Sequence, residues 1–216
     1  MNIAADNPYF QVGIDVADRP CLVIGGGAEA EDKSARLLEA KAHLVVVSAR
    51  VTPQLESSAQ EGRLIWHERL FRMDDLDGKH LVVNTVGDDL PLAEKVYERA
   101  CQTRLLINSF DQPQYSNFGM AALVHPGPLR ISISTSNASP ALASRLRQDL
   151  EQLFDDEFVE FVTQLKRVRQ KLRQQMDDRP ARMELLRSLV TDFRLEGKLS
   201  YPEGWRRRLA GFLADE

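Results

Sequence analysis

Short apolar runs alternate with longer amphipathic stretches through the first half of the chain. Five of these runs have the length and composition of buried strands. They are residues 21–24, 43–47, 64–66, 79–85 and 105–107. Residues 9–16 alternate in part between apolar and polar positions, which predicts a further strand. The first half of the chain is therefore expected to contain several short strands.

Stretches with helical spacing separate the apolar runs. Ala35, Leu38 and Ala42 recur at helical intervals and predict a helix over residues 28–41. Thr52-Pro53 supplies an N-cap and a proline at the first helical position, so a short helix is expected to about residue 60. Residues 90–103 predict another helix. This alternation predicts a parallel sheet covered on both faces, with right-handed crossovers.

The pattern changes after residue 110. Residues 129–135 alternate with period two and predict a half-exposed strand. Ser139-Pro140 starts a predicted helix that runs to about residue 154. An apolar stripe predicts the next helix, and residues 181–194 and 204–213 also read as helical. The stripe consists of Phe158, Phe161, Leu165, Val168 and Leu172. We therefore expect an α/β domain, a small connecting segment and a helical C-terminal region.

Composition narrows the function classes. The 216 residues carry 28 basic and 32 acidic side chains, a net charge of −4, which disfavours a nucleic-acid partner. No apolar run reaches the length of a membrane span, and the polar residues 1–6 do not resemble a secretory signal. Cys21 and Cys101 form no CxxC pair, so neither a disulfide framework nor a zinc site is expected. A cytoplasmic location follows as the expectation.

Residues 25–30, Gly-Gly-Gly-Ala-Glu-Ala, lie between a predicted strand and a predicted helix. They fit the pattern GxGxxG/A of Rossmann-type dinucleotide sites. In that pattern the first glycine permits a tight turn, the second admits a pyrophosphate, and the small third residue permits close packing. The helix N-terminus supplies free N–H groups for the phosphates. The alternative is a plain tight turn in an α/β protein.

Two features of this region bear on the cofactor. Glu29, Glu31 and Asp32 crowd the first turns of the helix, where they favour the helix dipole but repel phosphates if they face them. The acid that binds the ribose of NAD is absent after the second strand, where Ser48-Ala49-Arg50 stands. Arg50 fits either a site for the 2′-phosphate of NADP or a solvated loop.

Two long segments carry a family resemblance. Residues 21–49 (CLVIGGGAEAEDKSARLLEAKAHLVVVSA) and residues 107–151 (INSFDQPQYSNFGMAALVHPGPLRISISTSNASPALASRLRQDLE) are similar to two signatures of the precorrin-2 dehydrogenase and sirohydrochlorin ferrochelatase family. This family includes the N-terminal module of siroheme synthases. The second signature is the more specific of the two, and the resemblance covers about residues 8–155.

The resemblance implies an oxidoreductase that converts precorrin-2 to sirohydrochlorin with NAD in siroheme biosynthesis. Some members also insert ferrous iron, a lyase activity that yields siroheme. It further implies a homodimer, with an NAD-binding Rossmann-like domain at residues 1–112, a dimerisation segment at 113–150 and a helical domain at 151–216. We expect the predicted strand 129–135 and the helix that starts at Ser139 to form the dimer contact.

The resemblance also assigns site residues. Asp111 stands at the position of the family's catalytic aspartate, within Asn108-Ser109-Phe110-Asp111. The expected cofactor-binding residues surround the glycine turn and the ends of the neighbouring strands. They are Gly25, Gly26, Gly27, Ala28, Glu29, Ala49, Arg50, Thr85 and Val86. Arg130 and His125 are the expected substrate-binding residues, and no metal ligands are assigned.

The chemistry of the reaction agrees with a carboxylate at this position. Asp111 follows a strand-like run, and open α/β sheets bind ligands beyond the carboxyl ends of their strands. Oxidation of precorrin-2 removes a hydride, which NAD accepts, and a proton, which a carboxylate accepts as general base. Iron insertion releases two pyrrole protons, and the same carboxylate can receive a proton or guide the metal. The alternative for an aspartate before Gln-Pro is a turn residue.

A substrate with eight carboxylates requires basic groups near the cleft. Arg130, Arg145 and Arg147 are candidates, although Arg145 and Arg147 also fit an ordinary solvated helix face. The four histidines show no spacing typical of metal ligands. Two alternative functions stay open: a binding module that holds a tetrapyrrole or nucleotide without turnover, and a dehydrogenase of another modified tetrapyrrole.

Overall fold

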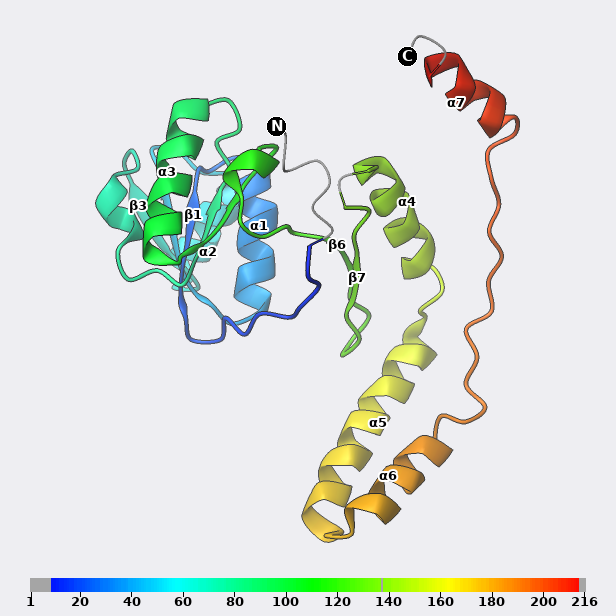
Figure 1. Cartoon of the computed structure of the whole chain (residues 1–216). Coiled ribbons are helices and arrows are strands. Elements are labelled where there is room, and N and C mark those ends of the chain that lie inside the picture. The colour runs from blue at the N-terminus through cyan, green and yellow to red at the C-terminus, as the bar shows by residue number, and fades with distance from the viewer. Residues whose placement is uncertain (1–8, 137, 214–216) are drawn as a thin grey trace. The chain divides into compact units, whose positions relative to one another are not determined.

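The computed structural model describes residues 9–136 and 138–213. Contacts within the chain divide it into two compact units, the first ending at Val159 and the second beginning at Glu160. The first unit contains the sheets, and the second is helical (Figure 1).

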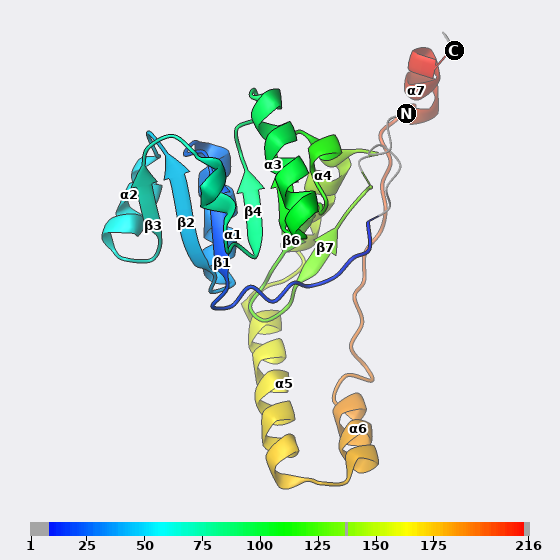
Figure 2. The same ribbon diagram turned by 60° about the vertical axis from the view of Figure 1, so that its left-hand side comes forward.

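A five-stranded parallel sheet organises the first unit. Its order is β3-β2-β1-β4-β5, and Figure 2 shows neighbouring strands with their arrowheads at one edge. The strands are β1 (Pro20–Ile24), β2 (His43–Ser48), β3 (Ile65–Glu68), β4 (Leu81–Asn84) and β5 (Leu106–Ser109). The chain moves outward from β1 through β2 to β3 and then crosses to β4. The order therefore reverses between β1 and β4, the position at which open α/β sheets bind ligands.

Three helices connect the strands: α1 (Ala28–Glu39), α2 (Pro53–Gln60) and α3 (Leu90–Thr103). The Thr52 hydroxyl accepts the N–H of Leu55 at the start of α2, and Asp89 caps α3 by accepting the N–H of Leu92. Two short 3-10 helices also occur: η1 (Met73–Leu76) lies between β3 and β4, and η2 (Pro113–Tyr115) follows β5. The β3–β4 connection thus carries η1 where the others carry an α-helix.

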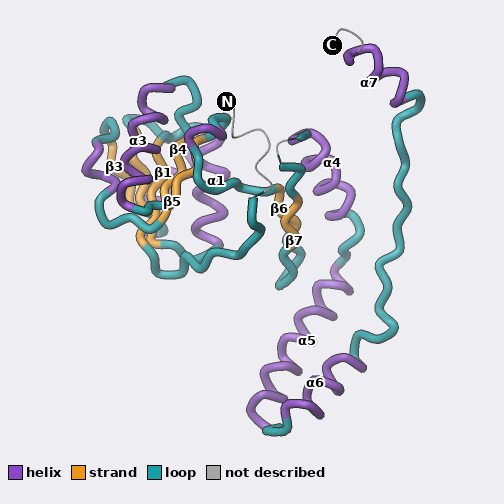
Figure 3. The backbone as a smooth tube through the Cα atoms, viewed as in Figure 1, coloured by secondary structure: helices purple, strands orange, loops and turns teal. Residues whose placement is uncertain are grey.

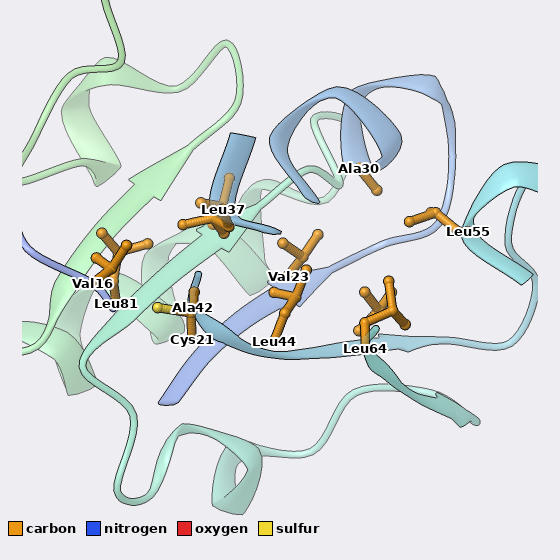
Figure 4. Close-up of a cluster of buried hydrophobic side chains, with 12 residues drawn as sticks. Val16, Cys21, Val23, Ala30, Leu37, Ala42, Leu44, Leu55, Leu64 and Leu81 are labelled. Carbon is orange, nitrogen blue, oxygen red and sulfur yellow. The ribbon is translucent and has the colours of Figure 1, made fainter. Parts of the chain in front are cut away.

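The core lies on both faces of the sheet because successive side chains of a strand point to opposite sides. Cys21 and Val23 belong to a cluster that includes residues of α1 and α2, shown in Figure 4. Leu22 and Ile24 belong to a second cluster with residues of α3. Burial raises the pKa of the Cys21 thiol to about 11, although Lys79 opposes the shift. Cys21 is therefore a protonated core residue at neutral pH.

A smaller layer follows β5 within the first unit. Strands β6 (Ala122–Val124) and β7 (Ile131–Ile133) pair antiparallel, and helix α4 (Pro140–Glu151) packs on them. The Ser139 hydroxyl accepts the N–H of Leu142 and caps α4. Arg36 of α1 donates to the carbonyl of Ala121 at 3.1 Å, which ties this layer to the Rossmann-type sheet domain.

The second unit contains the rest of α5 (Asp156–Gln175), followed by α6 (Arg179–Ser188) and α7 (Trp205–Leu213). A long loop joins α6 to α7 (Figure 3). The rings of Phe161 on α5 and Phe193 in this loop stack with centroids 5.9 Å apart. Within the part of the chain that the structure describes, no helix combines the length and apolar character needed to cross a bilayer.

The predicted α/β class with a helical C-terminal region is confirmed, and the helix over residues 90–103 has the predicted bounds. The strand predicted over residues 9–16 is wrong, because this segment forms no strand. Phe10 and Val12 are 91% and 60% exposed, and only Val16 is buried. Alternation along this segment therefore does not reflect one buried face. Strand β6 was not predicted, since a strand of three residues is too short to show a period.

Candidate nucleotide-binding edge and adjoining cleft

The glycine turn after β1 is held between the ends of β2 and β4. Gly25 has φ +108°, and a Cβ at this residue would lie 2.3 Å from Oγ1 of Thr85. Thr85 holds that position because its hydroxyl donates to the carbonyl of Ile24 at 2.8 Å. The N–H of Gly25 donates to the carbonyl of Val47 at 3.0 Å. Both the backbone angle and the contact require glycine here.

Gly26 is closed in by the loop that follows β2. A Cβ at Gly26 would lie 2.0 Å from the carbonyl oxygen of Arg50. The Ser48 hydroxyl donates to the same carbonyl at 2.6 Å and fixes the loop, while the N–H of Thr52 donates to the carbonyl of Gly26 at 3.0 Å. The exposed pair Ala49-Arg50 is therefore held beside the turn, next to where a cofactor would bind.

Gly27 faces open space. It is the N-cap of α1, and no atom lies within 4 Å of the position that a Cβ would occupy. Ala28 and Glu29 follow as the first residues of the helix. The carboxylate of Glu29 pairs with Lys33 one turn further along, at 3.4 Å. The N-terminus of α1 therefore offers backbone N–H groups and uncrowded space, which fits a pyrophosphate group.

Thr85 and Val86 form the opposite wall of this turn, directly after β4. The N–H of Thr85 donates to the carbonyl of Ile24 at 2.9 Å, and the N–H of Val86 donates to Oδ1 of Asn84 at 3.1 Å. Both residues lie at the point where the strand order reverses. The structure thus brings together all nine residues that the sequence predicted for the cofactor.

A cleft of about 400 Å³ opens beyond the carboxyl end of β5. Asp111 lies in its wall, two residues after the strand. The polar residues of the lining include Lys33, Asn108, Ser109, Asp111, Gln112 and Ser134. The cleft and the glycine turn open at the same edge of the sheet, with β4 between their two strands.

The loop after β5 holds Asp111 by returning along the strand. Asn117 continues the ladder: its Oδ1 accepts the N–H of Ile107 at 2.8 Å and its Nδ2 donates to the carbonyl of Leu105 at 2.8 Å. Asn108 donates to the carbonyl of Phe118 at 3.0 Å. Asp111 itself has φ +57°, in the left-handed region that aspartate tolerates better than most residues. The exposed carboxylate is thus presented on a fixed turn.

A second cavity of about 260 Å³ shares four lining residues with this cleft. The shared residues are Met120, Ala121, Ser134 and Pro140. Arg147 on α4 lines the second cavity. Its neighbour Arg145 lines neither cavity and pairs with Asp149 at 2.9 Å, as expected for a solvated helix residue.

Arg130 and His125 lie elsewhere. The guanidinium of Arg130 pairs with Glu39 at 2.5 Å and donates to the carbonyl of Gly127 at 2.6 Å. Nδ1 of His125 lies 3.9 Å from the same Glu39 carboxylate. Glu39 ends α1, whereas the glycine turn lies at the start of that helix. The structure does not bring either residue into the lining of the two cavities, so their role in substrate binding stays a prediction.

Lys33 is the cleft residue that sequence reasoning missed. It lies one helical turn after Glu29, and its side chain is only 15% exposed. The sequence offered no signal beyond a lysine at i+4 from a glutamate, which is common on solvated helices. Its place in the cleft depends on the loop after β5, which no local pattern predicts. Within residues 9–136 and 138–213, no three histidine, cysteine, aspartate or glutamate residues cluster as metal ligands would.

A sequence model of the family described as "Putative NAD(P)-binding" matches residues 12–122, which contain the glycine turn, the five-stranded sheet and Asp111. The chain belongs to this NAD(P)-binding family. Siroheme synthase 3 of Aeromonas hydrophila subsp. hydrophila is 36% identical over 145 residues, which are 67% of this chain and 31% of the relative. Siroheme synthase of Citrobacter koseri is 32% identical over 192 residues, which are 89% of this chain and 42% of the relative.

The chain thus spans less than half the length of the curated relatives that it matches. Among solved structures, that of "SirC, precorrin-2 dehydrogenase" resembles this chain with a TM-score of 0.73 and 22% identity. The match covers 96% of this chain and 100% of the other. The likeness shows that the two chains share a fold, including the helical region after the sheets.

Proposed function

We propose that this chain is an NAD-dependent oxidoreductase that converts precorrin-2 to sirohydrochlorin in siroheme biosynthesis. The observation that carries the proposal is the placement of two elements at one edge of the sheet. The glycine turn with its open helix N-terminus follows β1, and the carboxylate of Asp111 follows β5 inside a cleft. Relatives named siroheme synthase and a fold relative named precorrin-2 dehydrogenase support the choice of substrate.

The residues at the glycine turn fit a dinucleotide. Gly27 leaves space for phosphates, and the N-terminus of α1 supplies N–H donors and a partial positive charge. Ala49 and Arg50 would contact the adenosine of the dinucleotide. Thr85 and Val86 would contact the part of the dinucleotide that extends over β4. NAD supplies the hydride acceptor when it is bound. The chain itself supplies a turn that orients the cofactor without a charged side chain at the phosphates.

Asp111 provides the acid–base chemistry in this proposal. Removing a hydride from precorrin-2 leaves a cation that must lose a proton, and the Asp111 carboxylate accepts that proton as general base. Hydrogen bonds of Asn108 and Asn117 hold the two ends of the loop that carries Asp111, so the carboxylate extends from a fixed part of the backbone. Ferrous iron, as a second substrate, displaces two pyrrole protons, of which the same carboxylate accepts one and solvent water the other.

The test is an assay of the full chain with precorrin-2 and NAD under anaerobic conditions, followed by absorbance. Asp111→Asn removes the base and retains a residue that tolerates positive φ. We expect a loss of kcat of at least about a hundredfold, the lower range for general base catalysis. Ferrous iron added after oxidation reports chelation in the same cuvette, and NADP in a parallel arm reports cofactor choice.

Asp111→Gly separates catalysis from backbone strain. Glycine adopts φ +57° without penalty, so this variant should be at least as stable as Asp111→Asn and equally inactive. Precorrin-2 turnover by Asp111→Asn at the wild-type rate would exclude the general-base role. A wild-type chain that binds the tetrapyrrole but reduces no NAD would instead be the binding module. A chain that oxidises another tetrapyrrole but not precorrin-2 would show that the proposed substrate is wrong.

We also propose that the chain works as a homodimer in the cytoplasm. Strands β6 and β7 have three residues each, and so small a two-stranded sheet is marginal without further cover. Leu142 on α4 is 51% exposed next to that sheet. Both features support residues 113–150 as the dimerisation segment. The cytoplasmic location rests on the cysteine content, with Cys21 and Cys101 both free.

A further inference from the structure

The two cavities beside β5 share a wall. Met120 and Ala121 from the segment before β6, together with Ser134 and Pro140, line both of them. Three of these four residues are apolar, so the lining that the two cavities share is mostly apolar. Charged residues complete the two linings, with Lys33 and Asp111 in the first cavity and Arg147 in the second.

Lys33 is an enclosed cation in the first cavity. Its side chain is 15% exposed, and its ammonium lies 2.7 Å from Asp32 and 3.4 Å from Glu29. These two carboxylates are themselves 58% and 43% exposed, so they face solvent more than the lysine does. An ammonium has three N–H donors, and two carboxylates leave one for a ligand.

Arg147 is the corresponding cation in the second cavity. One of its terminal nitrogens donates to both carboxylate oxygens of Glu151 at 2.7 Å, and its side chain is 35% exposed. A guanidinium has five N–H donors in a planar fork, so this pairing leaves most of them available. Ion pairs between helix residues four apart contribute little to stability. Replacing Glu151 by a carboxylate of the ligand as the partner of Arg147 should therefore cost little free energy.

We propose that the two cavities form one trough for a planar polycarboxylate, with Lys33 and Arg147 binding its carboxylates at the two ends. The apolar shared wall fits the face of a macrocycle, and the cations fit acidic groups on its rim. The identity of the ligand as a tetrapyrrole rests on the proposed function, whereas the two-ended binding rests on the cavities and the two cations. Because the net charge is −4, attraction of such a ligand depends on local cations.

Binding is tested on the full chain with uroporphyrin, a macrocycle with eight carboxylates, by fluorescence titration without NAD. Lys33→Gln and Arg147→Gln should each raise the Kd about tenfold, the effect of one lost charge-assisted contact. The double variant should raise it about a hundredfold if the ends act independently. Lys33→Arg retains the positive charge and should restore most of the affinity.

Matched controls exclude a general charge effect. Arg145→Gln removes the same charge from α4 and breaks the same kind of pair with Asp149, but Arg145 lines neither cavity. Lys95→Gln removes a lysine from α3 that also lies outside both linings. Both controls should keep the wild-type Kd within about twofold. Thermal unfolding of each variant tests whether the fold is retained.

The outcomes for the trough and for the enzyme are distinct. A Kd unchanged in Lys33→Gln and Arg147→Gln would overturn the trough, even if precorrin-2 is oxidised. The trough would also be overturned if Arg145→Gln and Lys95→Gln raised the Kd for uroporphyrin as much as Lys33→Gln and Arg147→Gln do. A wild-type chain that binds uroporphyrin with the predicted pattern but does not oxidise precorrin-2 would refute the proposed function and leave the trough in place.

Discussion

Three successive glycines after β1 meet three different environments. A side chain at Gly25 would collide with the hydroxyl of Thr85, and one at Gly26 would collide with the backbone of Arg50. Gly27 has open space in front of it. The first two glycines are therefore required by the folded chain itself, whereas the third is free to serve a ligand. Substitution at Gly26 and at Gly27 separates these roles.

Gly27→Ala should preserve the fold and weaken NAD binding. Alanine at the N-cap costs about 0.5 kcal/mol of stability, and its methyl group would occupy the space left for the pyrophosphate. We expect a rise in the Kd for NAD of at least about tenfold, measured by calorimetric titration. Gly26→Ala is the contrasting variant, because the backbone contact should lower the free energy of unfolding by about 1–3 kcal/mol.

The two glycine variants also test the cofactor site. Urea unfolding gives the stability of both, and titration gives their affinity for NAD. If Gly27→Ala binds NAD as tightly as the wild type, the pyrophosphate does not lie at the start of α1. If Gly26→Ala is as stable as Gly27→Ala, the loop after β2 moves away freely and does not form a fixed wall.

At the scale of elements, the connection between β3 and β4 lacks the α-helix found in the other crossovers. An ion pair stabilises it: the guanidinium of Arg69 donates to both oxygens of Asp75 at 2.6 and 2.8 Å. The N–H of Arg72 donates to the same carboxylate at 2.8 Å. Asp75 is 12% exposed. The hydrogen bonds from Arg69 hold the pKa of Asp75 below its usual value, against the opposing effect of burial.

Asp75→Asn should therefore lower the free energy of unfolding at pH 7 by about 1–2 kcal/mol. Because the pKa of Asp75 is lower in the folded than in the unfolded chain, the stabilisation is complete above the unfolded value of about 3.9. It is lost as the pH falls through the folded value. The difference between the wild type and the variant should thus shrink below about pH 4, measured by urea unfolding from pH 3 to 8.

Asp77→Asn is the control for this prediction. Asp77 follows η1 and pairs with Arg99 at 3.1 Å, but its side chain is 62% exposed. An exposed pair contributes less than about 1 kcal/mol, so the effect should be smaller than at Asp75. If Asp75→Asn lowers the free energy of unfolding by the same amount at every pH, the charge of the carboxylate is not what stabilises the connection.

The sequence predicts an element when the residues that specify it are neighbours along the chain. The five strands and three helices of the sheet domain follow from apolar runs and caps that are local, such as Thr52-Pro53. The glycine pattern of residues 25–30 is local as well, whereas the neighbouring residues expected at the cofactor were assigned through the family resemblance. Other positions depend on contacts between residues far apart in sequence. These are the position of Lys33 in the cleft and the positions of Arg130 and His125 beside Glu39. No periodicity encodes these contacts.

The net charge of the whole chain does not favour the proposed ligands. The chain is acidic, yet the proposed ligands are anions. The sites identified here contain backbone N–H groups at the start of α1 and two cations, each paired with acids on its own helix. Because acids on the same helix offset these cations, we expect ligand selection to depend on direct contact rather than on long-range attraction.

The oligomeric state is the last prediction. Light scattering at micromolar concentration should give a mass twice the 24.4 kDa of one chain. Leu142→Glu places a charge on an exposed apolar position of α4 and should shift the mass toward the monomer. Gln148→Glu adds the same charge to an exposed polar position of the same helix and should remain dimeric. The reason is that a charge in a buried apolar contact must be desolvated, whereas a charge on a solvated face need not be.

These masses also locate the contact. If Leu142→Glu remains a dimer, the interface lies outside α4, and the exposed apolar side chains of the second unit become its expected position. They include Met183, Leu185, Leu189, Val190 and Leu195. A wild-type mass of one chain would exclude the dimer itself. In that case the small β6–β7 sheet would be stabilised by α4 and the sheet domain alone.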